Sequence, residues 1–255
     1  MRTAAILPVK RFPLAKQRLG ESVADGLRAD LARAMVGDVL SALHECPAID
    51  TTIVVTSEPA VASAARYIGA VVVEDSAPLT GTPHDGGQAG ESGQSAAASL
   101  GLARALADDF ERALCVPGDC PTLDPGELAE LLLDETPGVT IVPDRHGSGT
   151  NGLLLCPPGA LSPSFGPDSR ARHERLAAEV GAACRIATPA SLLLDIDTGA
   201  DLTVLRERLA GECTRAPRTR AVLAHAPRTA PSAAPSDDGT AGEDGPTPDF
   251  DSRAA

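Results

Sequence analysis

Three aspartates follow apolar runs of the sequence and are candidates for metal binding. Asp119 comes shortly after one apolar run, and Asp195 and Asp197 lie two positions apart in the segment LLDIDT. We expect residues 192–196 to form a strand, in which Asp195 and Asp197 point to the same side, because strand side chains alternate between faces. Like charges on one face repel each other unless a cation lies between them. Since Mg²⁺ prefers oxygen ligands, the three carboxylates predict a magnesium site. The alternative is a solvated acidic edge, with Asp119 capping a turn.

Two lysines lie six positions apart in the loop that follows the predicted strand 4–9. They are Lys10 and Lys16, and apart from histidine every other basic residue of the chain is arginine. A compact ammonium group suits the crowded oxygens of a triphosphate better than the larger, planar guanidinium group. The loop therefore predicts a site for nucleotide phosphates, with two solvated surface charges as the alternative.

Two further loops carry groups that bind anions. The loop 144–152 is rich in glycine, which lets backbone N–H groups approach an anion closely. The segment 165–173 leads into a predicted helix beginning at Ser169, and the first N–H groups of a helix bind phosphate or carboxylate. The alternatives are a hairpin turn and an ordinary serine cap. His173, one turn into that helix, has no partner visible in the sequence, and we expect a surface histidine.

Short apolar runs alternate with amphipathic stretches along the chain, which predicts strands that alternate with helices. The expected strands are 4–9, 52–56, 71–74, 113–116, 139–142, 152–155 and 192–196, and the expected helices are 22–43, 60–67, 95–106, 125–133, 169–180 and 200–209. Continuous apolar strands are typical of a mostly parallel sheet covered on both faces, a three-layer α/β fold. In such sheets the site lies beyond the carboxyl ends of the strands, where the residues above occur.

Composition narrows the class of protein. The chain has 255 residues, a formal net charge of −13 and six cysteines without a CxxC pair. The acidity argues against nucleic acid and membrane surfaces as partners, and the scattered cysteines favour reduced thiols in a cytoplasmic protein. We expect one domain over residues 1–211. Residues 212–255 are rich in Pro, Ala and Asp and poor in large apolar side chains, so we expect a disordered tail. The polar segment 78–93 predicts a loop.

Five motifs of the sequence occur in a distinctive order: LPVK-x3-LAKQRL at 7–19, VPGDCPTL at 116–123, PDRHGSGTNGL at 143–153, FGPDSRARH at 165–173 and LLDIDTGADL at 193–202. Together they resemble those of the guanylyltransferases of coenzyme F-420 biosynthesis. The resemblance covers residues 3–210 and implies the nucleotidyltransferase version of the GT-A fold. This sequence departs from the family pattern at Gly93-Gln94-Ser95, where members usually carry a Gly-Leu-Asn-like segment.

The resemblance also implies roles for individual residues. The family's metal-binding aspartates fall on Asp119, Asp195 and Asp197, and the implied cofactor is Mg²⁺. Its residues for the phosphorylated three-carbon acid fall on Thr150, Gly166 and Ser169. The candidate nucleotide-binding residues are Pro8, Lys10, Lys16, Arg18, Gln94 and Ser95, with Lys10 and Lys16 as the candidate catalytic lysines.

The implied reaction is the transfer of GMP from GTP to phosphoenolpyruvate, giving enolpyruvoyl-2-diphospho-5'-guanosine and pyrophosphate, with the product passed to a deazaflavin transferase. The same transfer to 2-phospho-L-lactate, giving lactyl-2-diphospho-5'-guanosine, is one alternative. The Ala-, Arg- and Pro-rich sequence is typical of a bacterium with a high-GC genome, which through the family pattern favours phosphoenolpyruvate as the acceptor. A cytidylyltransferase or molybdopterin nucleotidyltransferase of the same fold is another. A non-catalytic nucleotide-binding module is the alternative from a different class. The attacking phosphate oxygen is already ionised near neutral pH, so the reaction needs no general base.

Overall fold

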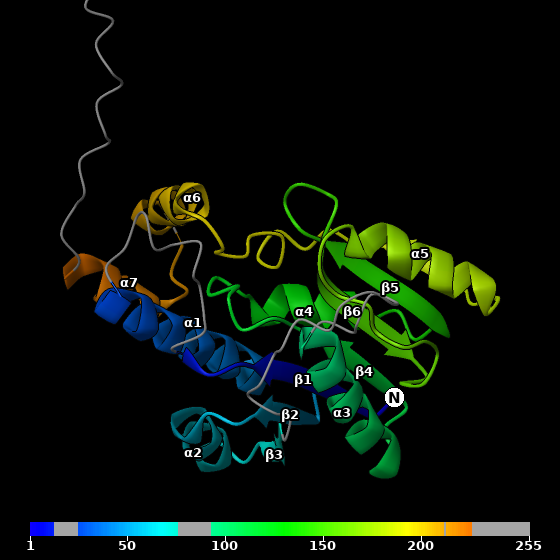
Figure 1. Cartoon of the computed structure of the whole chain (residues 1–255). Helices are drawn as coiled ribbons and strands as arrows, with labels where there is room; N and C mark the ends of the chain where they lie inside the picture. Colours follow the sequence, from blue (N-terminus) through cyan, green and yellow to red (C-terminus); the bar gives the residue numbers. More distant parts are fainter. Residues whose placement is uncertain (13–24, 76–92, 212, 226–255) are drawn as a thin grey trace, which may run out of the picture.

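The structure is a computed structural model that describes residues 1–12, 25–75, 93–211 and 213–225. These residues form a seven-stranded sheet in the order β3-β2-β1-β4-β6-β5-β7 (Figure 1). The strands are β1 (Thr3–Val9), β2 (Thr51–Thr56), β3 (Val71–Glu74), β4 (Arg112–Cys115), β5 (Gly138–Pro143), β6 (Thr150–Cys156) and β7 (Cys184–Ile186).

Most neighbouring strands run parallel. β1 pairs in parallel with β2 and β4, β2 with β3, and β5 with β7, whereas β6 runs antiparallel to β4 and β5. The carboxyl ends of β1 and β4 therefore meet the first residues of β6 at one edge of the sheet. The predicted mostly parallel α/β sheet is confirmed, and β6 is the strand that reverses it.

Helices cover both faces of the sheet. The helices α1 (Asp25–Glu45), α2 (Pro59–Tyr67) and α4 (Pro125–Leu131) pack on one face, and α3 (Gly93–Ala107) and α5 (Ser169–Glu179) pack on the other. Side chains of β1 alternate between the two cores, with Leu7 on the α1 side and Ile6 on the α3 side. α3 lies very close to β1, because a Cβ on Gly101 would come within 2.3 Å of Ile6 Cγ2.

The predicted strand 192–196 is wrong. Residues 187–198, all within the described part of the chain, contain no strand, and the short strand β7 occupies the edge of the sheet beside β5. Leu194 and Ile196 are nevertheless buried while Asp195 is only half-buried, so the apolar–polar alternation of the sequence survives as alternating burial. The alternation reported which side chains face the core, but it carried no information on whether a neighbouring strand was available for pairing.

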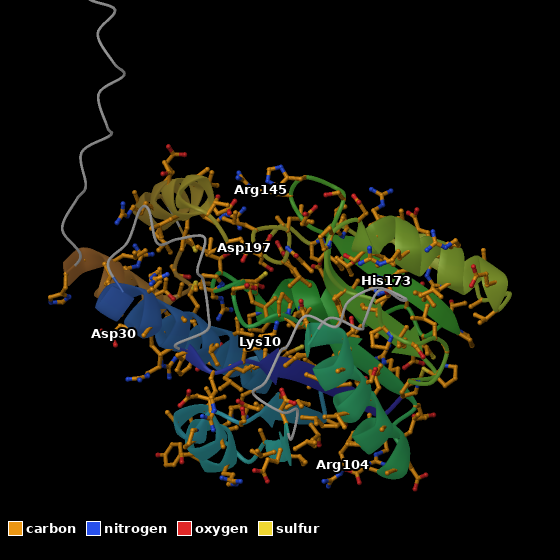
Figure 2. All side chains as sticks on the ribbon, in the orientation of Figure 1. Lys10, Asp30, Arg104, Arg145, His173 and Asp197 are labelled. Carbon is orange, nitrogen blue, oxygen red and sulfur yellow. The ribbon has the colours of Figure 1, made fainter. Side chains whose placement is uncertain are left out.

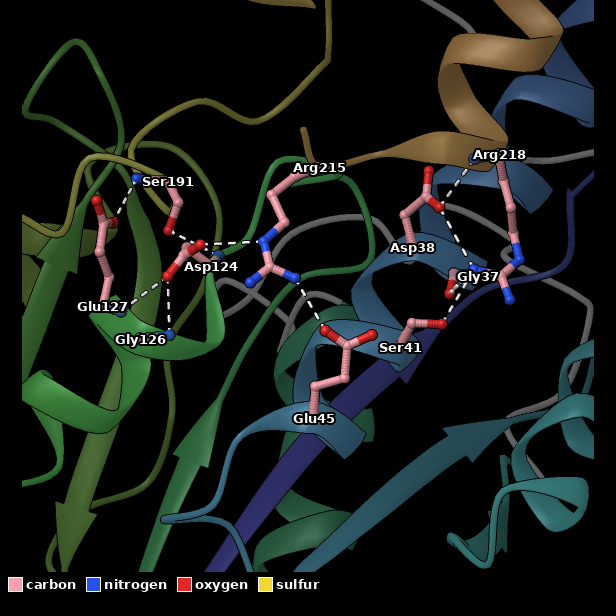
Figure 3. A network of polar contacts seen from close by, with 10 residues as sticks. All are labelled: Gly37, Asp38, Ser41, Glu45, Asp124, Gly126, Glu127, Ser191, Arg215 and Arg218. Atoms are coloured by element: carbon pink, nitrogen blue, oxygen red, sulfur yellow. Dashed lines mark hydrogen bonds and ion pairs between the residues drawn. The ribbon is translucent and has the colours of Figure 1, made fainter. Parts of the chain in front are cut away.

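The boundary predicted at residue 211 is also wrong. Residues 217–225 form the helix α7 (Pro217–His225), which packs with α6 (Gly199–Ala210) against the first half of α1 (Figure 1). The carboxylate of Asp38 in α1 accepts a hydrogen bond from the backbone N–H group of Arg218 at 3.1 Å (Figure 3). It also accepts from the backbone N–H group of Thr219 at 2.8 Å. A capping side chain supplied by a distant helix stabilises a segment whose own composition indicates disorder.

Arg215 attaches the same C-terminal segment to two other elements. Its guanidinium group donates to Asp124 Oδ2 at 3.0 Å and to Glu45 Oε2 at 2.9 Å (Figure 3). Asp124 in turn caps α4, accepting from the N–H groups of Gly126 and Glu127. The remaining predicted tail, residues 226–255, and residues 78–92 of the predicted loop lie outside the described residues.

Candidate active site

Two neighbouring cavities open where β1 and β4 end and β6 begins. The Lys10 cavity has a volume of about 260 Å³ and is lined by residues that include Lys10, Val36 and Gly93. The Thr150 cavity has a volume of about 450 Å³ and is lined by residues that include Thr150 and Gly166. The two cavities share four lining residues, which are Gln94, Pro117, Asp119 and Asp197. Groups bound in the two cavities would therefore meet at the two aspartates.

The three candidate metal ligands come from two loops that are hydrogen-bonded to each other. Asp119 follows β4, and its carbonyl oxygen accepts a hydrogen bond from Ile196 N at 3.1 Å, which brings Asp195 and Asp197 beside it. All three aspartates line the Thr150 cavity. Asn151 Nδ2 donates to Asp195 Oδ1 at 3.2 Å and to Leu192 O at 3.0 Å, so the start of β6 fixes this segment.

Burial and like charge act together on Asp195. Burial, together with the negative charges of Asp119 and Asp197, raises the pKa of its carboxyl group to about 6, although the hydrogen bond from Asn151 opposes the rise. A bound cation would relieve this repulsion, and the donor set consists of carboxylate oxygens, which suits Mg²⁺. Among the described residues, no group of three or more His, Cys, Asp or Glu side chains is already arranged around one metal position. The structure thus brings the three carboxylates to one cavity without placing them in coordination geometry.

Asp197 is held from behind by the first turn of α6. Thr198 is the N-cap of α6, and Asp201 completes a capping box with it. Asp201 Oδ2 also accepts from the backbone N–H of Asp197 at 3.2 Å, and Asp201 Oδ1 pairs with Arg145 Nη2 at 2.7 Å. This arrangement ties the glycine-rich loop that contains Arg145 to the segment that carries Asp197.

The Lys10 cavity contains part of the predicted nucleotide site. Pro8, Lys10 and Gln94 line it, and Lys10 lies against the first residue of α3, since a Cβ on Gly93 would be 3.7 Å from Lys10 Nζ (Figure 2). The ammonium group and the N-terminus of α3 both favour negative charge there. Ser95 is buried and lines neither cavity; its Oγ instead accepts from Phe165 N at 2.8 Å. Lys16 and Arg18 lie outside the described residues.

The Thr150 cavity brings together the three residues predicted for the acid. Thr150 begins β6, Ser169 begins α5, and Gly166 lies in the loop before α5, with all three on the cavity wall. Gly166 has a φ of 112°, a conformation that side chains disfavour, so glycine is needed for this turn. The N-cap of α5 is Asp168, in left-handed conformation and without a side-chain cap. The alternative of an ordinary serine cap is therefore excluded.

One arginine fixes the loop before α5. Arg172 donates to the carbonyl oxygens of Ser164 and Phe165, at 3.1 Å each, and to that of Pro167. It also donates through Nε to Ser164 Oγ at 3.0 Å. With these carbonyl groups bound on one side, the loop keeps its shape beside the cavity.

The expectation of a surface histidine at 173 is wrong. His173 is fully buried, its Nδ1 lies 3.0 Å from Thr150 Oγ1, and its Nε2 accepts from Ser164 N at 2.8 Å. Burial and, after it, the nearby charge of Arg172 lower the pKa of the ring to about 4. The ring also packs edge-on against Phe165, with the centroids 5.3 Å apart. The spacing of His173 from Ser169 was visible in the sequence, but its partner on β6 was not.

The comparison with known proteins identifies the family. The family model described as "Guanylyl transferase CofC like" matches residues 3–86. The phosphoenolpyruvate guanylyltransferase of Conexibacter woesei is 44% identical over 234 residues, which cover 91% of this chain and 99% of that protein. The chain belongs to the phosphoenolpyruvate guanylyltransferase family. The resemblance drawn from the five motifs is thereby confirmed.

Solved structures agree with this family on the fold. A structure from Desulfovibrio desulfuricans G20, assigned to the nucleotide-diphospho-sugar transferases, has a TM-score of 0.64 at 16% identity and covers 88% of this chain and 95% of its own. A nucleotidyl transferase from Methanothermobacter thermautotroptrophicus has a TM-score of 0.53 at 20% identity and covers 82% of this chain and 98% of its own. The GT-A-like nucleotidyltransferase fold expected for a phosphoenolpyruvate guanylyltransferase is confirmed. Across the described helices, none has the length and apolar character required to cross a bilayer.

Proposed function

We propose that the chain transfers GMP from GTP to phosphoenolpyruvate, giving enolpyruvoyl-2-diphospho-5'-guanosine and pyrophosphate. Membership of the phosphoenolpyruvate guanylyltransferase family supports the reaction class and the acceptor. The observation that carries the proposal is the pair of cavities that meet at Asp119 and Asp197. A two-substrate transfer requires such a meeting point, because the attacking oxygen and the α-phosphorus must be held in line.

The chemistry is a displacement at phosphorus. A phosphate oxygen of phosphoenolpyruvate attacks the α-phosphorus of GTP, the new P–O bond forms, and the bond to the bridging oxygen of the β-phosphate breaks. Pyrophosphate leaves with that oxygen and the bonding electrons. The nucleophile is ionised at neutral pH, so the protein contributes positioning and charge neutralisation rather than proton abstraction.

We assign the metal ligands to Asp119, Asp195 and Asp197, whose carboxylates line one cavity. Bound Mg²⁺ would neutralise negative charge on the phosphates of both substrates. In its absence the three carboxylates repel one another: after burial, the charges of Asp119 and Asp197 are what raise the pKa of Asp195. This repulsion and the oxygen-only donor set are what support a divalent cation here.

We assign the two substrates to different cavities. In the Lys10 cavity, Pro8, Lys10 and Gln94 would contact GTP, and we assign Lys16, Arg18 and Ser95 to the same substrate from the resemblance alone. In the Thr150 cavity, Thr150, Gly166 and Ser169 would hold the three-carbon acid. Ser95 itself lines neither cavity, and its hydroxyl group accepts from the backbone N–H of Phe165, which lines the Thr150 cavity.

Pyrophosphate release tests the function directly. The full chain is incubated with GTP and Mg²⁺ and either phosphoenolpyruvate or 2-phospho-L-lactate, and pyrophosphate and the guanosine product are measured. We expect turnover with phosphoenolpyruvate, a Mg²⁺ requirement, and passage of the product to a deazaflavin transferase of the F-420 pathway. Faster turnover with 2-phospho-L-lactate would assign the other acceptor. GTP binding without pyrophosphate release from either acid would favour the non-catalytic nucleotide-binding module.

A further inference from the structure

We propose that His173 is a positioning residue, which donates its Nδ1 proton to Thr150 Oγ1 and thereby directs the Thr150 hydroxyl proton into the Thr150 cavity as a donor to the acceptor's anionic group. The inference rests on the proposed function for the identity of that anion. The hydrogen bonds of the His173 ring determine the direction of the Thr150 hydroxyl proton.

Nε2 of His173 is a hydrogen-bond acceptor. The backbone N–H of Ser164 points at this atom with an N···N distance of 2.8 Å. A backbone N–H can only donate, so Nε2 must accept and carries no proton. Arg172 donates to Ser164 O and Oγ, which holds the Ser164 backbone in this orientation.

Nδ1 of His173 carries the proton of the ring. His173 is fully buried, and both its burial and the charge of Arg172 lower the pKa of the ring, to about 4. The ring is therefore neutral at pH 7 and has one proton. Because Nε2 has none, the proton is on Nδ1, whose partner is Thr150 Oγ1 at 3.0 Å. His173 is thus the donor in this contact.

The proton on Nδ1 determines the direction of the Thr150 hydroxyl group. A hydroxyl group has one proton and two lone pairs, and one lone pair of Thr150 Oγ1 accepts from His173. The hydroxyl proton cannot also point at Nδ1, so it is available to the cavity that Thr150 lines. With the opposite tautomer, the hydroxyl group would donate to the ring and present a lone pair to the cavity, which would repel a carboxylate or phosphate. The tautomer of His173 therefore converts Thr150 from an ambivalent group into a donor for anions.

The tautomer can be measured without any turnover. Long-range ¹H–¹⁵N correlation spectra of the ¹⁵N-labelled full chain at pH 7 distinguish Nδ1–H, Nε2–H and doubly protonated rings by their nitrogen shifts. The signals of His173 among the five histidines are those that disappear in His173→Asn. We expect an Nδ1–H ring, whereas an Nε2–H tautomer or an imidazolium would overturn the proposal. This result is independent of whether the proposed reaction occurs.

A matched pair of variants tests the role in acceptor binding. The side-chain amide of Asn can place an N–H near the position of Nδ1, whereas that of Gln reaches the position of Nε2 and can accept from Ser164. We expect His173→Gln to raise the KM for phosphoenolpyruvate about 10- to 100-fold with little change in the KM for GTP, since the Thr150 hydroxyl group is no longer held as a donor to the charged group. We expect His173→Asn to retain most of the affinity.

Combination with Thr150→Val separates positioning from general packing. If His173 acts through the hydroxyl group, adding His173→Gln to Thr150→Val should produce no further rise in the KM for phosphoenolpyruvate. Multiplying effects, or equal losses in His173→Asn and His173→Gln accompanied by equal falls in melting temperature, would show a packing role only. Absence of turnover in the unmodified chain would count against the proposed function, and the spectra would still decide the tautomer.

Discussion

The Lys10 cavity and the Thr150 cavity adjoin each other but have different walls. The Thr150 cavity is built on loops whose backbone groups are bound by Ser95, Arg172 and His173. The Lys10 cavity has apolar walls from α1 and β1, including Met35 and Val36, with Lys10 at its edge. One cavity is organised by fixed polar contacts, whereas the other is an apolar surface beside an exposed cation.

This difference matches the chemistry of the two proposed substrates. A phosphorylated three-carbon acid has little apolar surface, so selectivity for it depends on hydrogen-bond donors held in place before it binds. A nucleoside triphosphate is larger, with a base that packs on apolar side chains and phosphates that need charge. The shared aspartates, Asp119 and Asp197, belong to neither type of wall and serve both cavities.

The largest expected effect is at the shared carboxylates. Asp197→Asn and Asp195→Asn should each lower kcat/KM for both substrates by about 100- to 1000-fold, because the charge that holds the cation is lost. Their melting temperatures without metal should stay level or rise slightly, since repulsion is relieved. Steady-state kinetics over a range of Mg²⁺ concentrations measures the loss.

Asp108→Asn is the matched control for these variants. Asp108 pairs with Arg104 at the surface of α3, at 2.7 Å, and the change should leave kinetics unaltered. Near-normal activity of Asp197→Asn at modest Mg²⁺ would refute the assignment of the metal ligands.

The next prediction tests the division between the cavities. Ser169→Ala should raise the KM for phosphoenolpyruvate about 10- to 150-fold, equivalent to about 1.5–3 kcal/mol, with the KM for GTP little changed. Ser169 lines only the Thr150 cavity of the two. Varying each substrate in turn at saturation of the other gives both constants.

Lys10→Ala is the reciprocal variant, because Lys10 lines only the Lys10 cavity of the two. Its defect should be in GTP use, at about 10-fold, since its exposed charge is screened by solvent. A Ser169→Ala enzyme whose defect appeared only in the KM for GTP would break the comparison between the cavities.

The parts of this site that the sequence could predict are those encoded by local pattern. Apolar runs such as 4–9 located the strands, and the residues just after them located Lys10 and Asp119. The segment 192–196 shows the limit of this reasoning, because its alternation placed Asp195 on the correct side of the chain without any strand pairing. Burial pattern is local, whereas pairing depends on which strand is adjacent.

Contacts between distant segments were beyond prediction for the same reason. The partner of His173 lies on β6, 23 positions away, and the cap of α7 is Asp38, 180 positions from Arg218. Neither contact has a signal in the residues nearby. In both cases a residue or segment interpreted as exposed or disordered is stabilised by hydrogen bonds to a remote element.

A smaller effect is expected where α7 meets α1, away from both cavities. Asp38→Ala removes the acceptor of the Arg218 and Thr219 N–H groups and should destabilise the chain by about 1–2 kcal/mol, or roughly 2–8 °C in melting temperature. Kinetic constants at 25 °C should not change. Asp30→Ala, on the exposed side of α1, is the matched control and should leave the melting temperature within about 1 °C. A changed KM in Asp38→Ala would show that α7 influences the site.

The smallest effect is expected from truncation after His225. Residues 226–255 have Phe250 as their sole large apolar side chain, so their removal deprives the core of almost no buried surface. Truncation after Gly211 is the contrasting variant, because it also removes Arg215 and α7 and leaves the buried Asp38 carboxylate without the N–H groups of that helix. We expect the chain truncated after His225 to keep its melting temperature and both KM values. The chain truncated after Gly211 should lose more thermal stability than Asp38→Ala does. Equal melting temperatures for the two truncated chains would mean that α7 contributes nothing to stability, and a fall after removal of 226–255 alone would mean that this segment packs on the domain. Thermal unfolding of the three chains at one protein concentration distinguishes these outcomes.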